Sequence, residues 1–301
     1  MANVNERYSN NAEGQFFVDR TCINCDACRQ LAPKTFGEAN GHSFVFDQPK
    51  TEEEERAATR ALLSCPVGCI GTVGPNKAKE TMKDLPLKLA ESVYYCGFNS
   101  PKSYGGNSYF IVHPDGNWLI DSPKFLPHLV QRFTEMGGIK YIFLTHRDDV
   151  ADAYKYAEKF NAQRIIHMEE SDSAPGAEIV LNIDADQAVN SSLHSAFTTD
   201  LSDQFKIIFT PGHTKGHICL LYDKQFLFSG DHIAFDRESQ ELESFRDYCW
   251  YSWQEQIKSI AKLKELKFSC IYPGHGQSIC TSETDMQQKL NTLVESIKNQ
   301  P

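Results

Sequence analysis

The sequence has no long hydrophobic run and no secretory leader. No stretch approaches the roughly 18 uncharged apolar residues that a membrane helix needs, and the polar N-terminus lacks the basic start and apolar stretch of a signal peptide. Basic residues are also the minority: 30 lysines and arginines stand against 40 acidic residues, which gives a formal net charge of −10. We therefore expect a cytoplasmic protein that has neither a membrane nor a nucleic acid as its partner.

The ten cysteines do not form the pattern of a disulfide framework. Such frameworks belong to short secreted chains, whereas this chain has 301 residues, enough for one small and one medium domain. Clustered cysteines in an intracellular protein more often hold a metal. Five cysteines crowd the first quarter and five are scattered singly, namely Cys22, Cys25, Cys28, Cys65 and Cys69, then Cys96, Cys219, Cys249, Cys270 and Cys280. We expect the scattered group to be buried free thiols.

Changes of composition along the chain predict two domains joined by a linker. We expect the first domain at 1–75, a largely polar linker at 76–91 and the second domain at 92–301. In the second domain strand-like and helix-like segments alternate, which is typical of a layered α/β domain. The predicted strands are 107–112 and 118–120, joined through the turn sequence His113-Pro-Asp-Gly, then 140–144, 164–167, 205–210, 218–222, 225–228 and 270–272. The predicted helices are 127–136, 149–160, 253–266 and one that begins near Ser282.

The cysteine cluster of the first domain has the spacing of an iron–sulfur site. Two residues lie between Cys22 and Cys25 and two between Cys25 and Cys28. With this spacing, a tight loop can bring three thiolates to three corners of a cubane cluster. A fourth ligand is available from Cys65, which precedes a proline. The alternative is a structural zinc site, although such sites usually use pairs of cysteines. Cys69 is interpreted as a packing residue or spare thiol, with a ligand or redox role as the alternative.

With these motifs, the segment from about Gly14 to Val73 resembles single-cluster ferredoxins of the bacterial type. The resemblance implies a small α+β ferredoxin-like fold with two helices and two hairpins, and one [4Fe–4S] cluster on Cys22, Cys25, Cys28 and Cys65. A single cluster carries one electron at a time. An electron-transfer partner protein is therefore one expected partner, besides a small-molecule substrate.

Four elements of the second domain place candidate metal ligands in loops after apolar strands. They are Phe143-Leu-Thr-His146-Arg-Asp148-Asp149-Val-Ala-Asp152, Thr210-Pro-Gly-His213-Thr-Lys-Gly-His217, Ser229-Gly-Asp231-His232 and Tyr272-Pro-Gly-His275. Strand ends on one edge of a sheet are where ligands of α/β proteins tend to bind. The neighbouring glycines allow the sharp turns that aim such side chains inward. The set predicts a metal site.

With these elements, the chain from about Ser92 to Gly276 resembles the metallo-β-lactamase superfamily. The resemblance implies a four-layer αββα sandwich with one or two metal ions between its sheets. The leading family motif, His-x-His-x-Asp-His, is altered here. Asp148 takes the second histidine position, Val150 and Ala151 fill the usual Asp-His pair, and Asp152 lies two residues late.

Carried over residue by residue, the resemblance implies two groups of ligands. The first metal would be bound by His146, Asp148, His213 and Asp231, and the second by Asp152, His275 and Asp231. Carboxylates in place of imidazoles favour iron or manganese over zinc. Simpler roles remain open: Asp148 and Asp149 are suited to capping a helix, and His217 is suited to a structural role or to lining the pocket.

Three functions are compatible with this composition. The first is a metal-dependent hydrolase of a small-molecule ester, thioester, lactone or phosphoester, with Asp231 and His217 as catalytic residues. The second is an oxidoreductase in which the [4Fe–4S] cluster passes electrons to an iron site. The third is a non-catalytic ligand-binding or electron-transfer protein with a degenerate metal site. The aromatic stretch 246–253 is interpreted as a pocket wall, with the core as the default place for buried aromatic residues.

Overall fold

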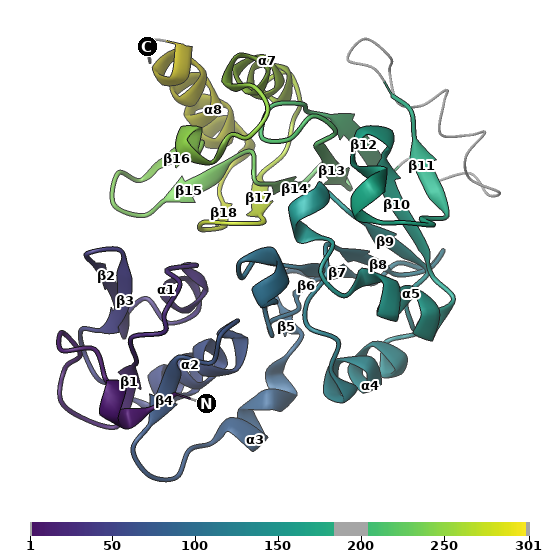
Figure 1. The fold of residues 1–301 in the computed structure, drawn as a ribbon. Coiled ribbons are helices and arrows are strands. Elements are labelled where there is room, and N and C mark those ends of the chain that lie inside the picture. The colour runs from purple at the N-terminus through teal and green to yellow at the C-terminus, as the bar shows by residue number, and fades with distance from the viewer. Residues whose placement is uncertain (1, 184–203, 299–301) are drawn as a thin grey trace.

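The computed structural model describes residues 2–183 and 204–298, and its N-terminal part is a small module (Figure 1). Two antiparallel pairs and two helices form it. Strand β1 (Phe16–Val18) pairs with the distant β4 (Ile70–Thr72), β2 (Phe36–Ala39) and β3 (His42–Val45) form a hairpin, and the helices are α1 (Ala27–Leu31) and α2 (Glu52–Ser64). Apolar side chains from all of these elements make one buried core. This agrees with the predicted ferredoxin-like fold.

Helix α2 illustrates how the local sequence sets these elements. Thr51 is its N-cap, and the Thr51 hydroxyl accepts a hydrogen bond from the Glu54 amide at 3.2 Å. Four glutamates follow in the first turn, where negative charge is favoured by the helix dipole. Ala58 and Ala61 are fully buried in the module core. The helix ends just before Cys65 and Pro66, so it delivers Cys65 to the core.

Two sheets form the second part of the chain. The first has the order β11-β10-β9-β8-β7-β6-β5 and the second the order β12-β13-β14-β17-β18. The strands of the first sheet are β5 (Leu87–Lys88), β6 (Val93–Tyr95), β7 (Tyr109–Ile111), β8 (Trp118–Ile120), β9 (Tyr141–Phe143), β10 (Gln163–His167) and β11 (Ile179–Leu181). Those of the second are β12 (Phe205–Phe209), β13 (Ile218–Tyr222), β14 (Phe226–Gly230), β17 (Cys270–Pro273) and β18 (Ile279–Cys280), with a separate hairpin of β15 (Ala234–Asp236) and β16 (Glu241–Glu243).

Helices cover the outer face of each sheet. One core lies between the sheets, a second joins the first sheet to α4 (Pro127–Glu135) and α5 (Ala153–Phe160), and a third joins the second sheet to α7 (Trp253–Leu263) and α8 (Glu283–Lys298). The layers are therefore helix, sheet, sheet and helix, as expected for an αββα sandwich. The remaining helices are short: α3 (Ala78–Thr81) and 3₁₀ turns at Val4–Glu6, Met82–Asp84, Pro101–Ser103, Arg147–Asp149, Met168–Ser173 and Arg246–Tyr248.

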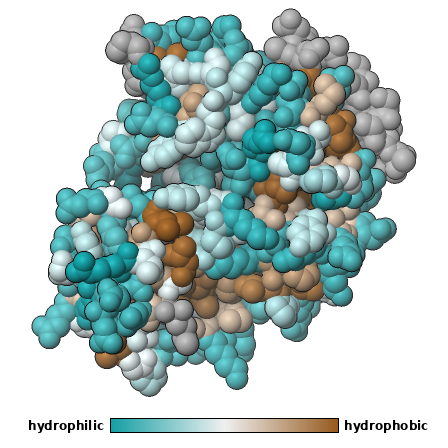
Figure 2. Space-filling view, in the orientation of Figure 1, coloured by the Kyte–Doolittle hydropathy of each residue, from teal (hydrophilic) through white to brown (hydrophobic). Residues whose placement is uncertain are grey.

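The module is docked against the sandwich by polar contacts. Asp84 receives hydrogen bonds from Arg56 and Arg60 of α2, the latter at 2.8 Å. Asp84 lies in the segment that leads into the sandwich, and contacts with the sandwich itself come from three places: Lys124 Nζ to the Cys65 carbonyl at 3.3 Å, Asn107 Nδ2 to Gln30 Oε1 at 3.2 Å, and Arg237 to the Arg29 carbonyl at 3.0 Å. Figure 2 shows a mainly hydrophilic face in this view, with hydrophobic residues gathered toward its middle.

Three local expectations differ from the structure. The predicted linker contains α3 and β5, and β5 is the edge strand of the first sheet. The helix expected at 149–160 begins only at Ala153, after a 3₁₀ turn. The expectation of free thiols is wrong for Cys270 and Cys280, which form a disulfide because they face each other across β17 and β18. Among the described residues, no helix is long and apolar enough to cross a membrane.

Candidate metal centre and its neighbouring cluster site

The ends of strands from both sheets deliver the candidate metal ligands. His146 follows β9 of the first sheet, and the 3₁₀ turn after it carries Asp148 and Asp149. His213, Asp231 and His275 follow β12, β14 and β17 of the second sheet. A positive φ of 50° at Gly230 turns the chain just before Asp231, and a β-carbon at Gly274 would lie 2.4 Å from Asp231 Oδ1. Only glycine allows this close approach at position 274.

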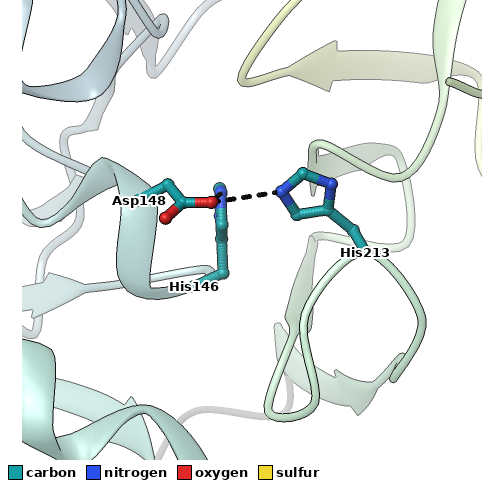
Figure 3. Close-up of side chains that lie close together, drawn as sticks. All are labelled: His146, Asp148 and His213. Atoms are coloured by element: carbon teal, nitrogen blue, oxygen red, sulfur yellow. Dashed lines mark ion pairs between the residues drawn. The ribbon is translucent and has the colours of Figure 1, made fainter. Parts of the chain in front are cut away.

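The donor atoms converge on one point. His146 Nε2 and His213 Nε2 lie 3.8 and 3.5 Å from Asp148 Oδ2 (Figure 3). The same two nitrogens lie 3.6 Å from Asp231 Oδ2, and His275 Nε2 lies 3.9 Å from it. Two ligands that each bind one cation at 2.0–2.2 Å are separated by about 3 to 4 Å. The spacing therefore suits ligands of a shared cation.

The hydrogen bonding of these atoms leads to the same conclusion. His146 Nε2, His213 Nε2, Asp231 Oδ1 and both carboxylate oxygens of Asp149 are buried and have no hydrogen-bond partner among the described residues. Buried polar atoms without a partner are costly, and bound cations would satisfy them. Two groups of donors each lie within 4.8 Å of one another: His146, Asp148 and His213, and His146, Asp149 and Asp231. The residues therefore fit one or two metal ions.

Asp149, rather than Asp152, is the additional carboxylate in this cluster. Asp149 is 1% exposed and its carboxylate touches the space beside Gly274 and Gly106. Asp152 points elsewhere and accepts hydrogen bonds from Lys102 at 2.8 Å and from the Phe125 amide at 3.1 Å. The structure thus brings together His146, Asp148, His213, Asp231 and His275 from the predicted ligand set, but not Asp152. The 3₁₀ turn, which the motif comparison did not anticipate, explains the change.

The electrostatics favour a neutral imidazole among crowded carboxylates. Burial lowers the pKa of His146 to about 4, so its Nε2 offers a lone pair at neutral pH. Burial raises the pKa of Asp149, and the nearby Asp231 raises it further. For Asp231 burial acts in the same direction, yet His275 and His146 outweigh it and lower the pKa of this carboxyl. A bound cation would relieve the repulsion among the carboxylates.

A hydrogen-bonded chain fixes the orientation of His146. Asp121 accepts the Thr145 amide at 2.9 Å and the Thr145 hydroxyl at 2.9 Å. The hydroxyl oxygen in turn lies 3.0 Å from His146 Nδ1, so this nitrogen donates and Nε2 is left as the acceptor. Such outer partners commonly orient a metal-binding histidine.

His217 lies behind the donors and not at the surface of the site. It is fully buried, and its Nδ1 lies 2.9 Å from the Thr210 hydroxyl. The His217 ring is 4.6 Å from His232 and 5.3 Å from His146, measured between centroids. Burial lowers the pKa of His217 and brings that of His232 to about 3. Both rings are therefore neutral at pH 7, and His217 Nε2 and both ring nitrogens of His232 also lack a hydrogen-bond partner among the described residues.

A second cavity, in the module, is the cluster site. It is lined by Cys22, Cys25, Cys28 and Cys65, the four predicted ligands, and by Cys69. All five are free thiols. Thiols that converge on one buried cavity fit a cubane cluster.

The two sites share a wall made of two glycines. A β-carbon at Gly105 would lie 2.9 Å from Cys25 Sγ, and one at Gly106 would lie 2.7 Å from Asp149 Oδ1. Because consecutive Cα atoms are 3.8 Å apart, a cluster ligand and a candidate metal ligand are at most about 13 Å apart. The wall is held in place by Asn99, whose amide donates to the Gly105 carbonyl at 2.7 Å, and by the Asn107 amide, which donates to the Gly274 carbonyl at 2.7 Å.

The aromatic stretch beside His213 is exposed. The side chains of Tyr248, Trp250 and Tyr251 are 60%, 64% and 49% exposed, which contradicts the expectation that they belong to the core. The amides of Trp250 and Tyr251 donate to the His213 carbonyl at 2.9 and 3.1 Å. The stretch is therefore attached to the loop of a candidate ligand and forms a rim next to it.

Comparison with known families matches both halves of the chain. Residues 18–72 match the 4Fe-4S single cluster domain of ferredoxin I, and residues 103–275 match the metallo-beta-lactamase superfamily. The second match covers more than half of the chain. The protein belongs to the metallo-β-lactamase superfamily and carries an N-terminal ferredoxin domain. Its cofactors are a [4Fe–4S] cluster and metal ions of the second domain, and the residues of both sites fit these groups.

Individual relatives are distant. The chain is 26% identical to the beta-lactamase-like protein 2 homolog of Drosophila melanogaster over 192 residues, covering 61% of this chain and 63% of that protein. It is 28% identical to a hydroxyacylglutathione hydrolase of Pelagibacter ubique over 174 residues, covering 56% and 65%. A metallo-beta-lactamase family protein of Thermus thermophilus superposes with a TM-score of 0.49 at 17% identity, covering 70% and 81%. The chain spans less than two thirds of these two curated relatives.

Proposed function

We propose that the protein is a metal-dependent hydrolase of a small-molecule ester or thioester. The observation that carries the proposal is the set of five buried donor atoms that have no hydrogen-bond partner among the described residues and that strand ends of both sheets bring together. Relatives named hydroxyacylglutathione hydrolase and atrochrysone carboxyl ACP thioesterase support the choice of substrate class. A lactone or a phosphoester is the alternative substrate class, and the test must distinguish it from esters and thioesters.

The residues of the site divide between binding and orientation. His146, Asp148 and His213 would hold one cation, and Asp149, Asp231 and His275 a second. A cation held there lowers the pKa of its bound water toward about 7 and so supplies hydroxide at neutral pH. Asp231 would be a ligand of that cation and would orient the water beside it. His217, expected to be catalytic, is assigned a positioning role because it contacts the His146 ring from the buried side.

The hydrolase proposal is tested by metal removal and reloading. Protein purified without oxygen would be stripped of second-domain metal, reloaded with Fe²⁺, Mn²⁺ or Zn²⁺, and assayed on thioesters, esters, lactones and phosphodiesters. We expect removal of the metal to lower kcat/KM at least 100-fold and reloading to restore it. The His213→Ala variant should not recover activity on reloading. The matched control is His128→Ala, which removes a histidine of α4 whose Nε2 lies 3.3 Å from the Leu85 carbonyl oxygen. Equal hydrolysis by stripped and reloaded protein would reject the proposal.

The shared glycine wall favours a second candidate, an oxidoreductase in which the cluster supplies electrons to the metal centre. Hydrolysis needs no electrons, whereas a cluster at most about 13 Å from a metal ligand is close enough to exchange them directly. Three of the six candidate donors are carboxylates, which are hard ligands and favour iron or manganese over zinc. Both observations are accounted for if the second domain reduces a small molecule.

Cluster reoxidation separates the two candidates. The cluster would be reduced by dithionite in protein loaded with iron or with redox-inert Zn²⁺, excess reductant removed, and the cluster absorbance followed after hydrogen peroxide is added under nitrogen. The oxidoreductase predicts rapid recovery of cluster absorbance in the iron form alone. Equal rates in the two forms would exclude the oxidoreductase and would not contradict the hydrolase proposal.

A further inference from the structure

The cluster cavity contains one thiol more than a cubane needs. Four cysteines suffice for a [4Fe–4S] cluster, but Cys69 also lines the cavity and is 3% exposed. Its sulfur lies 3.4 Å from the Cys65 sulfur, and its amide donates to the same sulfur at 3.3 Å. Cys69 belongs to the apolar core of the module, and within that core its sulfur faces a predicted ligand.

The backbone holds Cys69 in this position. Gly68, with a φ of 66°, turns the chain between Cys65 and Cys69, so that both side chains reach the same side of the loop. The Cys69 carbonyl accepts a hydrogen bond from the Asp19 amide at 2.8 Å, next to the β1–β4 pair. The backbone at Cys69 is therefore held by the sheet of the module.

We propose that Cys69 is a reserve ligand that exchanges with Cys65 at one iron of the cluster. In the exchange the iron–sulfur bond to Cys65 breaks, the bond to Cys69 forms, and the Cys69 proton moves to Cys65. Neither the number of electrons nor the net charge changes. Because the two sulfurs are 3.4 Å apart, side-chain rotation is enough and the backbone can stay in place. The cluster thereby survives the loss or modification of Cys65.

Removal of each thiol tests the exchange, with iron and sulfide per chain and the EPR signal of the reduced cluster as readouts. In anaerobically purified full-length protein, Cys65→Ala should keep at least half of the wild-type cluster, with a changed EPR signal. The double variant Cys65→Ala, Cys69→Ala should keep less than a tenth. Cys28→Ala, at a ligand beside Ser43, should also lose its cluster. If the Cys65→Ala protein contained as little iron and sulfide per chain as the Cys28→Ala protein, the proposal would be overturned.

A second measurement leaves all four predicted ligands in place, in case Cys65→Ala fails to fold. Iron loss to a chelator under nitrogen would be timed in wild type, Cys69→Ala and Cys69→Ser. We expect Cys69→Ala to lose iron several-fold faster than wild type, and Cys69→Ser to be intermediate because an alkoxide is a weaker ligand for iron. Identical rates in all three proteins would show that Cys69 only fills space. Neither experiment depends on turnover, so failure here is distinct from failure of the proposed hydrolase.

Discussion

Gly106 lies directly against Asp149, and its neighbour Gly105 lies against Cys25. A β-carbon at Gly106 would be 2.7 Å from Asp149 Oδ1, closer than real side chains approach. The metal centre and the cluster therefore meet at a segment that has no side chains. Substituting each glycine separately should disturb one site without the other.

The first prediction concerns these two glycines. Gly106→Ala should displace Asp149 and lower second-domain metal affinity about tenfold while cluster iron stays unchanged. Gly105→Ala should crowd Cys25 and reduce the cluster content instead. Metal and sulfide analysis checks both. Because Gly105 also has a positive φ of 88°, the control is Gly41→Ala, where φ is 71° and no atom lies within 4 Å, so only a backbone cost of about 1 kcal/mol is expected.

The second prediction separates two neighbouring aspartates. Asp149→Asn should weaken binding of a second metal ion by at least tenfold, because an amide is a poorer ligand than a carboxylate. Asp152→Asn should bind as wild type, since Asp152 is paired with Lys102 and Lys155. Isothermal titration with Mn²⁺ measures both affinities. Loss of metal only in Asp152→Asn would restore the sequence-based assignment and reject Asp149.

The third prediction concerns the contact between module and sandwich. The hydrogen bond from Arg56, with that from Arg60, lowers the pKa of Asp84. A lowered folded pKa means stability that is present above the unfolded value, near 4, and is lost as pH falls through the folded value. Asp84→Asn should therefore cost about 1 kcal/mol at pH 7 and progressively less below pH 4. Urea unfolding without oxygen measures this. Asp47→Asn, in the exposed pair with Lys50, should change nothing measurable.

The fourth prediction concerns the aromatic rim. Trp250→Ala should leave the melting temperature unchanged because the side chain is 64% exposed. It should raise KM several-fold for substrates with an apolar acyl group and leave small acetyl substrates unaffected. Tyr154→Ala removes an aromatic residue that is 52% exposed on α5 and serves as the control. Equal KM values for both variants would remove the rim from substrate binding.

The sequence predicts what depends on periodicity and fixed spacing. The hairpin of β7 and β8, helix α4 and the strands before His213, Asp231 and His275 lie where apolar patterns place them. The cysteine spacing likewise identifies the cluster site. The strands and helices follow from local sequence patterns, and the cysteine spacing follows from the geometry of the cluster.

What the sequence does not predict depends on tertiary geometry. The spacing suits Asp149 to helix capping, and nothing in it reveals the 3₁₀ turn that directs this side chain inward. The disulfide requires the register of β17 and β18, which pairs Cys270 with Cys280 across ten residues. Strand β5 falls in the predicted linker because two residues carry no detectable alternation. The contact of Gly105 with Cys25 joins the two halves, and the sequence of neither half predicts it.

The docking of the module has a consequence for kinetics. A ferredoxin on a flexible tether reaches its acceptor by diffusion, at an effective concentration set by the length of the tether. Here the Arg56, Lys124, Asn107 and Arg237 contacts hold the module in one orientation. Any electron transfer between cluster and metal centre would therefore be a first-order event, independent of solvent viscosity and of protein dilution.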